Sequence, residues 1–441
     1  MPSFSVWNFG CRVNLAESFA WVEAFRRRGL RFEEDWRRSD AVIVNSCTLT
    51  GRADRDVRKL IRKIGFENPG AKLVVTGCLA ERAPEEFVRA PGVALVLGNK
   101  EKPELVGKVL ALLSESQNGE LSGRVADEAP PKGRTVRGGE DDRQGTFRAR
   151  GTLKVQDGCD KRCAFCVIPS VRGPSASVPP GEVLAGVRDL VGRGYREIVL
   201  VGIDLSSYGD DLGQRMPLSG LLRQIVEVPG LGRVRLSSVD PGRVDKALIG
   251  LAAERDKVCR HFHLSLQHAS GRMLRLMGRA ADPEMYRRLL ADLREAVPGA
   301  ALGADVIVGF PGETEEEFEE LRGFLESSPL AYFHVFSYSP RRGTPAAGRR
   351  QVPDKIITER SVALRRLSGA KSLAFRRSFE GRALEAVVIK RGGGPKSKRA
   401  ELLTDNYIRV WAPPSPAPRG ELVRVRITRA LERSTEGAFD V

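Results

Sequence analysis

The sequence predicts an α/β protein of three parts: an amino-terminal parallel-sheet domain, a six-unit (β/α) partial barrel and a carboxyl-terminal small β-barrel. Two series of short apolar runs, each followed by a helix-like segment, predict the first two parts. Alternation of apolar and polar residues after residue 375 predicts the third. With 441 residues, of which 41% are hydrophobic, the chain can bury a core in each part.

The amino-terminal domain, residues 1–115, contains three apolar runs that each end in a small residue and a cysteine: residues 4–11, 41–47 and 72–78. Helix-like segments follow these runs, at residues 15–28, 53–64 and 84–89. Ligands gather at the carboxyl ends of parallel strands, so Cys11, Cys47 and Cys78 are expected to converge there. The alternative is three unrelated buried cysteines, since free cysteine is often buried.

Residues 116–148 are rich in Ser, Gly, Pro and charge and predict a linker. A second β/α series occupies residues 149–375, with strands expected at residues 152–156, 197–202, 233–237, 261–266, 304–309 and 332–338. Amphipathic segments lie between them, at residues 182–191, 285–296 and 315–325 among others. Six units make an open barrel, short of the eight that close one, and its active face is expected at the carboxyl ends of the strands.

The last domain, residues 376–441, alternates in three runs, 383–390, 400–411 and 421–430, which predict a small antiparallel barrel. It carries 14 basic and 8 acidic residues, a net charge of +6, within a chain whose own net charge is +16. Surplus positive charge suits contact with RNA, and the residues expected to neutralise phosphates include Lys396, Lys398, Arg399, Arg424 and Arg426. A structural or dimerising barrel is the alternative, and an arginine-rich proteome alone would also give a basic chain.

No apolar run reaches the length of a membrane span, and the first ten residues lack the pattern of a signal peptide, so a cytoplasmic protein without membrane contact is expected. Seven cysteines is an odd number. In a long chain without a secretory signal, it argues against a disulfide framework and for metal ligation or catalysis.

The segment "DGCDKRCAFC" places Cys159, Cys163 and Cys166 on one tight loop directly after the first strand of the second series. Structural zinc needs four protein ligands, and no fourth Cys or His lies nearby in sequence. Three thiolates on a four-iron cluster leave one iron open to a substrate or cofactor. Phe165 is placed to pack against an adenine ring.

This loop, at the start of a six-unit barrel, resembles that of the radical S-adenosylmethionine (SAM) superfamily. The whole layout is similar to the methylthiotransferases, which join a three-cysteine sheet domain, a radical SAM barrel and a barrel called TRAM. The resemblance implies two [4Fe-4S] clusters and SAM as cofactors. One cluster, on Cys159, Cys163 and Cys166, would cleave SAM to a 5′-deoxyadenosyl radical; the other, on Cys11, Cys47 and Cys78, would hold the sulfur.

Further residues match family motifs. "FGCRVNLAES" implies that Asn14 and Ser18 position Cys11, whereas Asp204 and Asp240 stand where relatives carry other polar groups. In "ADVIVGFPGETEEEF", Glu313 and Thr314 fit a helix start better than a catalytic carboxylate pair, and Asp305 fits a core or polar layer. Three other residues are expected to make structural or polar contacts: Cys259, His263 and His268. No general acid or base is identified.

Three branches of this family differ in substrate: threonylcarbamoyladenosine in tRNA, isopentenyladenosine in tRNA, and an aspartate of a ribosomal protein. "CTLTGRADRDVR" resembles the corresponding segment of the first branch. "GCRVN" fits that branch better than the alternatives "GCQMN" or "GCPKN" would, whereas "LQHAS" resembles the ribosomal-protein branch. The first branch implies radical methylthiolation at C2 of adenine in N6-threonylcarbamoyladenosine of a tRNA anticodon stem-loop. It also implies an electron donor, such as flavodoxin or ferredoxin, and a sulfur source.

The sequence alone also fits a function of another class, that of a non-catalytic RNA-binding protein. In such a protein the two cysteine triplets would hold structural metal. Bound iron and a visible spectrum distinguish the two functions, since structural zinc is colourless.

Overall fold

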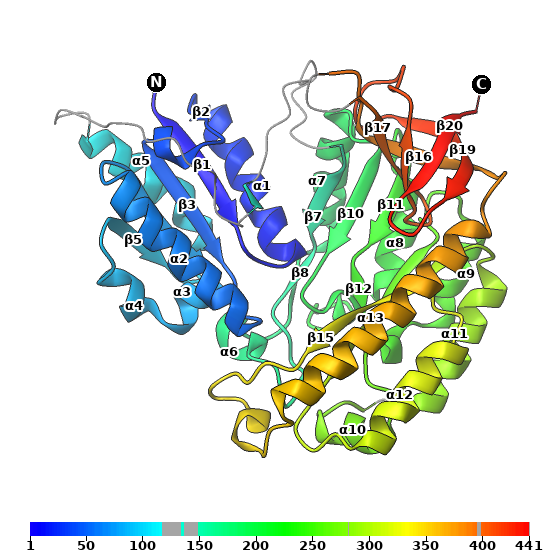
Figure 1. The fold of residues 1–441 in the computed structure, drawn as a ribbon. Coiled ribbons are helices and arrows are strands. Elements are labelled where there is room, and N and C mark those ends of the chain that lie inside the picture. Colours follow the sequence, from blue (N-terminus) through cyan, green and yellow to red (C-terminus); the bar gives the residue numbers. More distant parts are fainter. Residues whose placement is uncertain (117–133, 136–148, 281, 395–397, 441) are drawn as a thin grey trace.

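Two β/α domains and a small barrel follow one another in the computed structural model, which describes residues 1–116, 134–135, 149–280, 282–394 and 398–440. Figure 1 shows the amino-terminal sheet in blue, the partial barrel in green and yellow, and the small barrel in red. Most of the segment expected to be a linker, residues 116–148, lies outside the described residues. No helix within the described ranges is both long and apolar enough to cross a membrane.

The amino-terminal sheet has five parallel strands in the order β2 (Arg31–Phe32), β1 (Ser3–Asn8), β3 (Ala41–Ser46), β4 (Lys72–Gly77) and β5 (Val93–Leu97), with β6 (Arg134–Thr135) antiparallel to β1. Its helices are α1 (Arg12–Arg27), α2 (Gly51–Glu67), α3 (Cys78–Arg82), α4 (Pro84–Val88) and α5 (Leu105–Ser116), with short turns η1 (Trp36–Arg38) and η2 (Lys102–Glu104). Ile43 packs with side chains of α1 and α5 on one face of the sheet, and Val42 and Val44 pack with those of α2 on the other. Burial on both faces explains the continuous apolar runs that predicted these strands.

The partial barrel is confirmed as six strands, in the order β7 (Gly151–Lys154), β10 (Glu197–Val201), β11 with β12 (Arg233–Leu236, Ser238–Val239), β13 (His261–Gln267), β14 (Ala301–Val308) and β15 (Tyr332–Ser337). Only Ser237 separates β11 from β12, so these two segments act as one strand of the barrel. A short antiparallel pair, β8 (Gln156–Asp157) and β9 (Ala176–Ser177), flanks the first strand.

Helix α6 (Ile168–Arg172) lies next to α3 of the amino-terminal domain, and α10 (Gly271–Leu276) packs against Ala164 and Phe310. The other helices cover the outside of the partial barrel (Figure 1): α7 (Pro180–Gly192), α8 (Leu218–Val226), α9 (Lys246–Glu254), α11 (Pro283–Ala296), α12 (Glu315–Ser327) and α13 (Asp354–Arg377). Turns η3 (Leu205–Ser207), η4 (Pro241–Arg243) and η5 (Pro345–Gly348) follow three of the strands. Alternate strand residues such as Leu200, Phe262 and Leu264 pack in the core that these helices share. Because side chains alternate along a strand, the intervening residues, among them Arg235 and His263, face the concave side.

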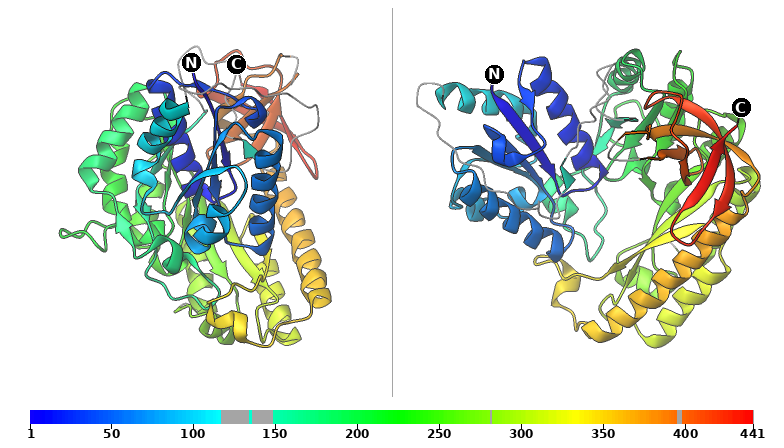
Figure 2. Two further views of the ribbon diagram at one scale, coloured as in Figure 1. Left: turned by 90° about the vertical axis from the view of Figure 1, so that its left-hand side faces the viewer. Right: turned by 45° about the horizontal axis from the view of Figure 1, so that its top comes forward.

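The carboxyl-terminal barrel is closed, in the order β16 (Ala383–Lys390), β17 (Ala400–Thr404), β18 (Arg409–Ala412), β20 (Thr435–Phe439) and β19 (Leu422–Ala430). The right-hand view in Figure 2 places it beside the partial barrel, away from the amino-terminal sheet. Two expectations were wrong: residues 400–411 form two strands rather than one, and β18 pairs with β20 in parallel. The run breaks because Asp405 and Asn406 favour a turn, in which Tyr407 adopts a φ of +67°.

Candidate functional site

The cysteines of the amino-terminal domain meet at the carboxyl edge of its sheet. Cys47 directly follows β3, Cys78 directly follows β4 as the first residue of α3, and Cys11 is the N-cap of α1. Burial raises the pKa of Cys47 to about 12; the Leu49 N–H opposes this effect, and the nearby Cys11 and Cys78 thiols add to it. The structure therefore brings the three cysteines together, as the sequence predicts.

A buried amide network fixes the positions of these cysteines. Asn14 on α1 donates from Nδ2 to Asn45 Oδ1 (3.0 Å) and to the Ser46 carbonyl (2.9 Å) on β3. Asn45 Nδ2 donates in return to the Asn14 carbonyl (2.9 Å) and to Ser18 Oγ (3.1 Å). Asn14 and Ser18 thus hold α1 against β3, and their role in positioning Cys11 stays a prediction. Asn45 was missed because it follows directly on the apolar run of its strand.

Gly77 permits the close approach of β3 and β4 just before Cys78. Its φ is +96°, and a Cβ at this position would lie 2.4 Å from the Ser46 carbonyl oxygen. Any other residue would therefore be strained and would push the strand end that carries Cys78 away from the strand end that carries Cys47.

The second triplet, Cys159, Cys163 and Cys166, lies on the loop between β8 and α6. The Ile168 N–H donates to Cys166 Sγ (3.4 Å), and the Arg279 guanidinium donates to Cys163 Sγ (3.9 Å). Burial raises the pKa of Cys166 to about 12, although the Ile168 N–H lowers it. Hydrogen bonds to the sulfurs and the nearby Arg279 cation favour thiolates, the form that binds metal.

A charged network holds this loop over the strand ends. Lys161, inside the loop, lies 2.8 Å from Asp204 and 2.7 Å from Asp240, and Arg279 also lies 2.7 Å from Asp240. The two aspartates, whose place in the family motifs was unusual, therefore anchor the cysteine loop. Sequence spacing gave no sign of Arg279, which lies 116 residues from the thiol it contacts.

The two triplets face a common space. Cys78, Ile168 and Val171 form one buried apolar cluster, against which Cys159 and Cys166 pack. Asn99 Nδ2 donates to the Val171 carbonyl (2.6 Å) and lies 3.9 Å from Cys78 Sγ, so it joins the two domains at this point. A sulfur source and a radical source held by these residues would be neighbours.

Each cysteine triplet offers three thiolates, which is the number that leaves one iron of a [4Fe-4S] cluster open to a ligand. Elsewhere in the described part of the chain, His263, Asp305 and His334 have donor atoms that all lie within 4.8 Å of one another.

Ion pairs lock the amino-terminal domain onto the partial barrel. Glu17 on α1 contacts Lys102 (2.5 Å), Lys154 (3.1 Å) and Arg172 (3.1 Å). Burial alone would raise the pKa of Glu17, but these three cations hold it well below its usual value. A second buried pair joins Arg341 to Asp54 at 2.9 Å. Asp54, which lies in the "CTLTGRADRDVR" segment, therefore helps to dock the amino-terminal domain onto the partial barrel.

Helix α1 closes the open side of the partial barrel. Val13 and Ala16 in its first turns pack against Val199 and Val201 on β10. The first turns of α1, which follow Cys11, therefore cover part of the concave face at β10. We call the concave side of strands β13 to β15 the central chamber.

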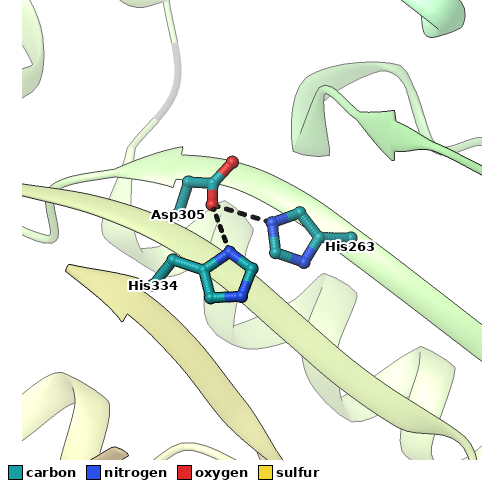
Figure 3. Close-up of side chains that lie close together, drawn as sticks. All are labelled: His263, Asp305 and His334. Carbon is teal, nitrogen blue, oxygen red and sulfur yellow. Dashed lines mark hydrogen bonds and ion pairs between the residues drawn. The ribbon is translucent and has the colours of Figure 1, made fainter. Parts of the chain in front are cut away.

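A polar group lines this chamber on three adjacent strands (Figure 3). Asp305 Oδ1 accepts hydrogen bonds from His263 Nε2 (2.8 Å) and His334 Nδ1 (3.2 Å). Burial would raise the pKa of Asp305, but the two imidazoles lower it to about 2. His263 also meets the Tyr332 hydroxyl at 3.1 Å, so this group is satisfied by its own hydrogen bonds.

Other sequence-predicted residues have structural contacts. Thr314 caps α12 and forms a capping box with Glu317, which confirms the helix start. Glu313 is buried against Arg360 (2.5 Å) and His268 (3.2 Å). Three residues lie elsewhere in the fold: Cys259 is buried near Arg235, Phe165 packs edge-on against Phe310, and Asp305 belongs to the polar group above. Contact of Phe165 with an adenine ring stays a prediction.

Comparison with known proteins gives matches along the whole chain. Residues 153–325 match the model of the radical SAM superfamily, and residues 3–98 match that of an uncharacterized protein family, UPF0004. The chain is 33% identical to threonylcarbamoyladenosine tRNA methylthiotransferase MtaB of Bacillus subtilis, covering 100% of this chain and 96% of the relative. It is 34% identical to ribosomal protein uS12 methylthiotransferase RimO of Anaeromyxobacter, covering 97% and 91%.

Two further matches complete the comparison. The chain is 31% identical to tRNA-2-methylthio-N(6)-dimethylallyladenosine synthase of Aquifex aeolicus, covering 98% of each protein. Among solved structures, the radical SAM methyltransferase TsrM of Kitasatospora setae aligns with a TM-score of 0.56 at 18% identity, covering 79% of this chain and 77% of that one. This last similarity concerns the fold alone.

Proposed function

Because the chain belongs to the radical SAM methylthiotransferase family, whose cofactors are SAM and two [4Fe-4S] clusters, we propose that it transfers a methylthio group to C2 of the adenine in N6-threonylcarbamoyladenosine, beside the anticodon of tRNA. The observation that carries the proposal is the meeting of two cysteine triplets from different domains at one apolar cluster. Cys159, Cys163 and Cys166 would hold the cluster that binds SAM, and Cys11, Cys47 and Cys78 would hold the auxiliary cluster.

The bound cofactors supply the radical and the sulfur. The chain supplies position and exclusion of water. Lys161, Asp204 and Asp240 hold the SAM-cluster loop over the strand ends, while Asn14 and Asn45 hold the auxiliary cysteines. Docking of α1 against β10 shields the chamber in which the adenine would lie.

Support for a tRNA substrate comes from the relatives and from one loop. The "LQHAS" segment, which resembles the ribosomal-protein branch, is the end of β13 and the turn after it: Gln267 has a φ of +71°, and His268 bonds to Glu313 at 3.2 Å. These contacts give the segment a role in the fold that does not require a protein substrate. The MtaB relative of Bacillus subtilis spans this whole chain and supports the threonylcarbamoyladenosine branch.

A basic cavity of about 510 Å³ offers a surface for the tRNA backbone. It opens between β15, α13 and the carboxyl-terminal barrel, and four arginines line it: Arg365, Arg376, Arg409 and Arg433. The sequence had suggested Lys396, Lys398, Arg399, Arg424 and Arg426 as phosphate contacts. Of these, Lys396 lies outside the described residues, and Arg399, Arg424 and Arg426 are paired with Glu436 or Asp440.

Replacing Arg365 and Arg433 by Gln should weaken tRNA binding and flatten its salt dependence. Both side chains are exposed at the cavity, and removing one phosphate contact should reduce the slope of log K against log[salt] by about 0.7–0.9. Filter binding or anisotropy over a salt series measures the slope. The matched control is Arg188→Gln on exposed α7, and an equal change in that variant would refute the cavity as the tRNA surface.

The proposed function is tested by mass spectrometry of tRNA nucleosides from cells with and without the gene. Loss of the methylthio form, with its threonylcarbamoyladenosine precursor retained, is the expected result. Persistence of that nucleoside, together with a ribosomal protein that loses the mass of a methylthio group, would instead assign the protein-modifying activity. The proposal also includes a cytoplasmic location, a donor such as flavodoxin or ferredoxin, and a separate sulfur source.

A further inference from the structure

Arg12, the residue that follows Cys11 in the sequence, extends its guanidinium to Tyr407 of the carboxyl-terminal barrel. It is the first residue of α1 and follows Cys11, and the turns after it pack against β10 on the concave face. Arg12 Nη2 donates to the Tyr407 hydroxyl at 3.2 Å, and its guanidinium carbon lies 5.9 Å from the centre of the Tyr407 ring. The amino-terminal domain and the carboxyl-terminal barrel therefore meet inside the partial barrel.

Tyr407 is a fixed aromatic surface at the floor of this chamber. Its ring stacks on His261 with a centroid distance of 4.2 Å and an angle of 17°. The turn that carries it is held by Arg233 and Arg235, which donate to the carbonyls of Leu403, Thr404 and Asp405 at 2.9 Å each. A non-glycine residue at positive φ persists only where its surroundings enforce it, and such residues cluster at functional sites.

Arg12 differs from its neighbouring cation in having no carboxylate partner. Two guanidinium groups lie over the Tyr407 ring, those of Arg12 and Arg235. Arg235 pairs with Glu197 at 2.8 Å, whereas no ion pair of Arg12 occurs among the described residues. Burial holds the pKa of His261 far below its usual value, and the nearby Arg235, His263 and Arg12 lower it further. The His261 ring is therefore uncharged at neutral pH.

Among the described residues, no carboxylate pairs with Arg12. The first turn of α1 contains no acidic residue, and the Asp305 carboxylate accepts its hydrogen bonds from His263 and His334 instead. An anion entering beside Tyr407 would therefore meet one unpaired cation. A planar guanidinium binds a carboxylate through two parallel hydrogen bonds, a geometry that a lysine does not provide.

We propose that Arg12 binds the free carboxylate of the threonyl group on the substrate adenine, with the Tyr407 ring as the surface against which that group lies. This assignment rests on the proposed function and names its specificity-determining residue. The other source of an anion is a backbone phosphate of the tRNA. The position of Arg12, one residue from Cys11 and inside the chamber, favours the modified base, which must approach the clusters.

The test combines a change in the enzyme with a change in the substrate, as in a double-mutant cycle. Each enzyme variant acts on two anticodon stem-loops, one with threonylcarbamoyladenosine and one with its carboxamide, which removes only the charge. For the native holoenzyme, kcat/KM should be about 10- to 100-fold higher for the carboxylate substrate. For Arg12→Gln the two values should become equal within about 3-fold, and Arg12→Lys should restore part of the preference.

Controls separate this role from damage to the auxiliary cluster. Iron content should be unchanged in Arg12→Gln. Arg27→Gln, at the exposed end of the same helix, should retain the native iron content and the full preference for the carboxylate substrate. An equal loss for both stem-loops in Arg12→Gln and Arg12→Lys would overturn the assignment and indicate phosphate binding or a structural role. A native enzyme inactive on both stem-loops would instead refute the proposed function.

Discussion

Replacing Cys159, Cys163 and Cys166 together by Ala is expected to abolish cleavage of SAM to 5′-deoxyadenosine. Replacing Cys11, Cys47 and Cys78 should leave that cleavage in place and stop carbon–sulfur bond formation, because the triplets lie on separate domains and meet only across an apolar cluster. Chromatography of 5′-deoxyadenosine and of methylthiolated nucleoside measures the two activities. Iron should fall from about eight per chain to about four in each variant.

Cys259 provides the matched control for these variants. Its thiol is at least as buried as those of the triplets but lies beside Arg233 and Arg235, apart from both. Cys259→Ala should therefore keep about eight irons and both activities. Loss of SAM cleavage in both triplet variants, with the fold intact, would contradict the division of roles.

Replacing Glu17 by Gln should destabilise the protein by about 3–5 kcal/mol, since it leaves buried cations unpaired. Glu17 and Lys102 are each 7% exposed, and Arg172 is 1% exposed. The folded-state pKa of Glu17 is lowered from an ordinary value of 4.5, so its contribution is complete above that pH and is lost as the pH falls below it. Denaturant unfolding at pH 7 and pH 4 measures both effects.

Glu23 on the same helix is the control for Glu17. It pairs with Arg193 at a more exposed position, so Glu23→Gln should cost less than about 1 kcal/mol. Glu17→Gln should also show a weaker decline in stability on acidification than the native protein. Equal destabilisation by the two substitutions would mean that the Glu17 cluster contributes no more than a surface pair.

Most of the two β/α domains could be predicted from the sequence, because doubly buried strands are continuous apolar runs that differ clearly from helices. Strands β2 and β6 were missed because each has two residues, and β5 was missed because no cysteine follows it. The run at 400–411 was wrongly interpreted as one strand, since its alternation continues across the turn at Tyr407. The end of β17 is set by tertiary contacts of the turn, whose carbonyls accept hydrogen bonds from side chains such as Arg235.

Local spacing identified the thiols but not the groups that hold them in place. Cys159, Cys163 and Cys166 share one short segment, and the other three cysteines share a repeated pattern. Arg172, by contrast, pairs with Glu17 across 155 residues, and Arg12 meets Tyr407 across 395. Such pairs depend on how domains dock, which periodicity within a single segment does not record.

The turn that carries Tyr407 makes the last domain inseparable from the reaction chamber. Arg233 and Arg235 are almost fully buried, and their donors are satisfied by carbonyls of that domain. A chain shortened after α13 would leave these donors without acceptors, at a cost of about 1–3 kcal/mol for each unsatisfied group. Exchanging this domain between relatives would therefore replace the Tyr407 side of the chamber, where we propose that the substrate lies. Chimeric enzymes should inherit substrate preference, as well as nucleic-acid affinity, from the protein that supplies the barrel.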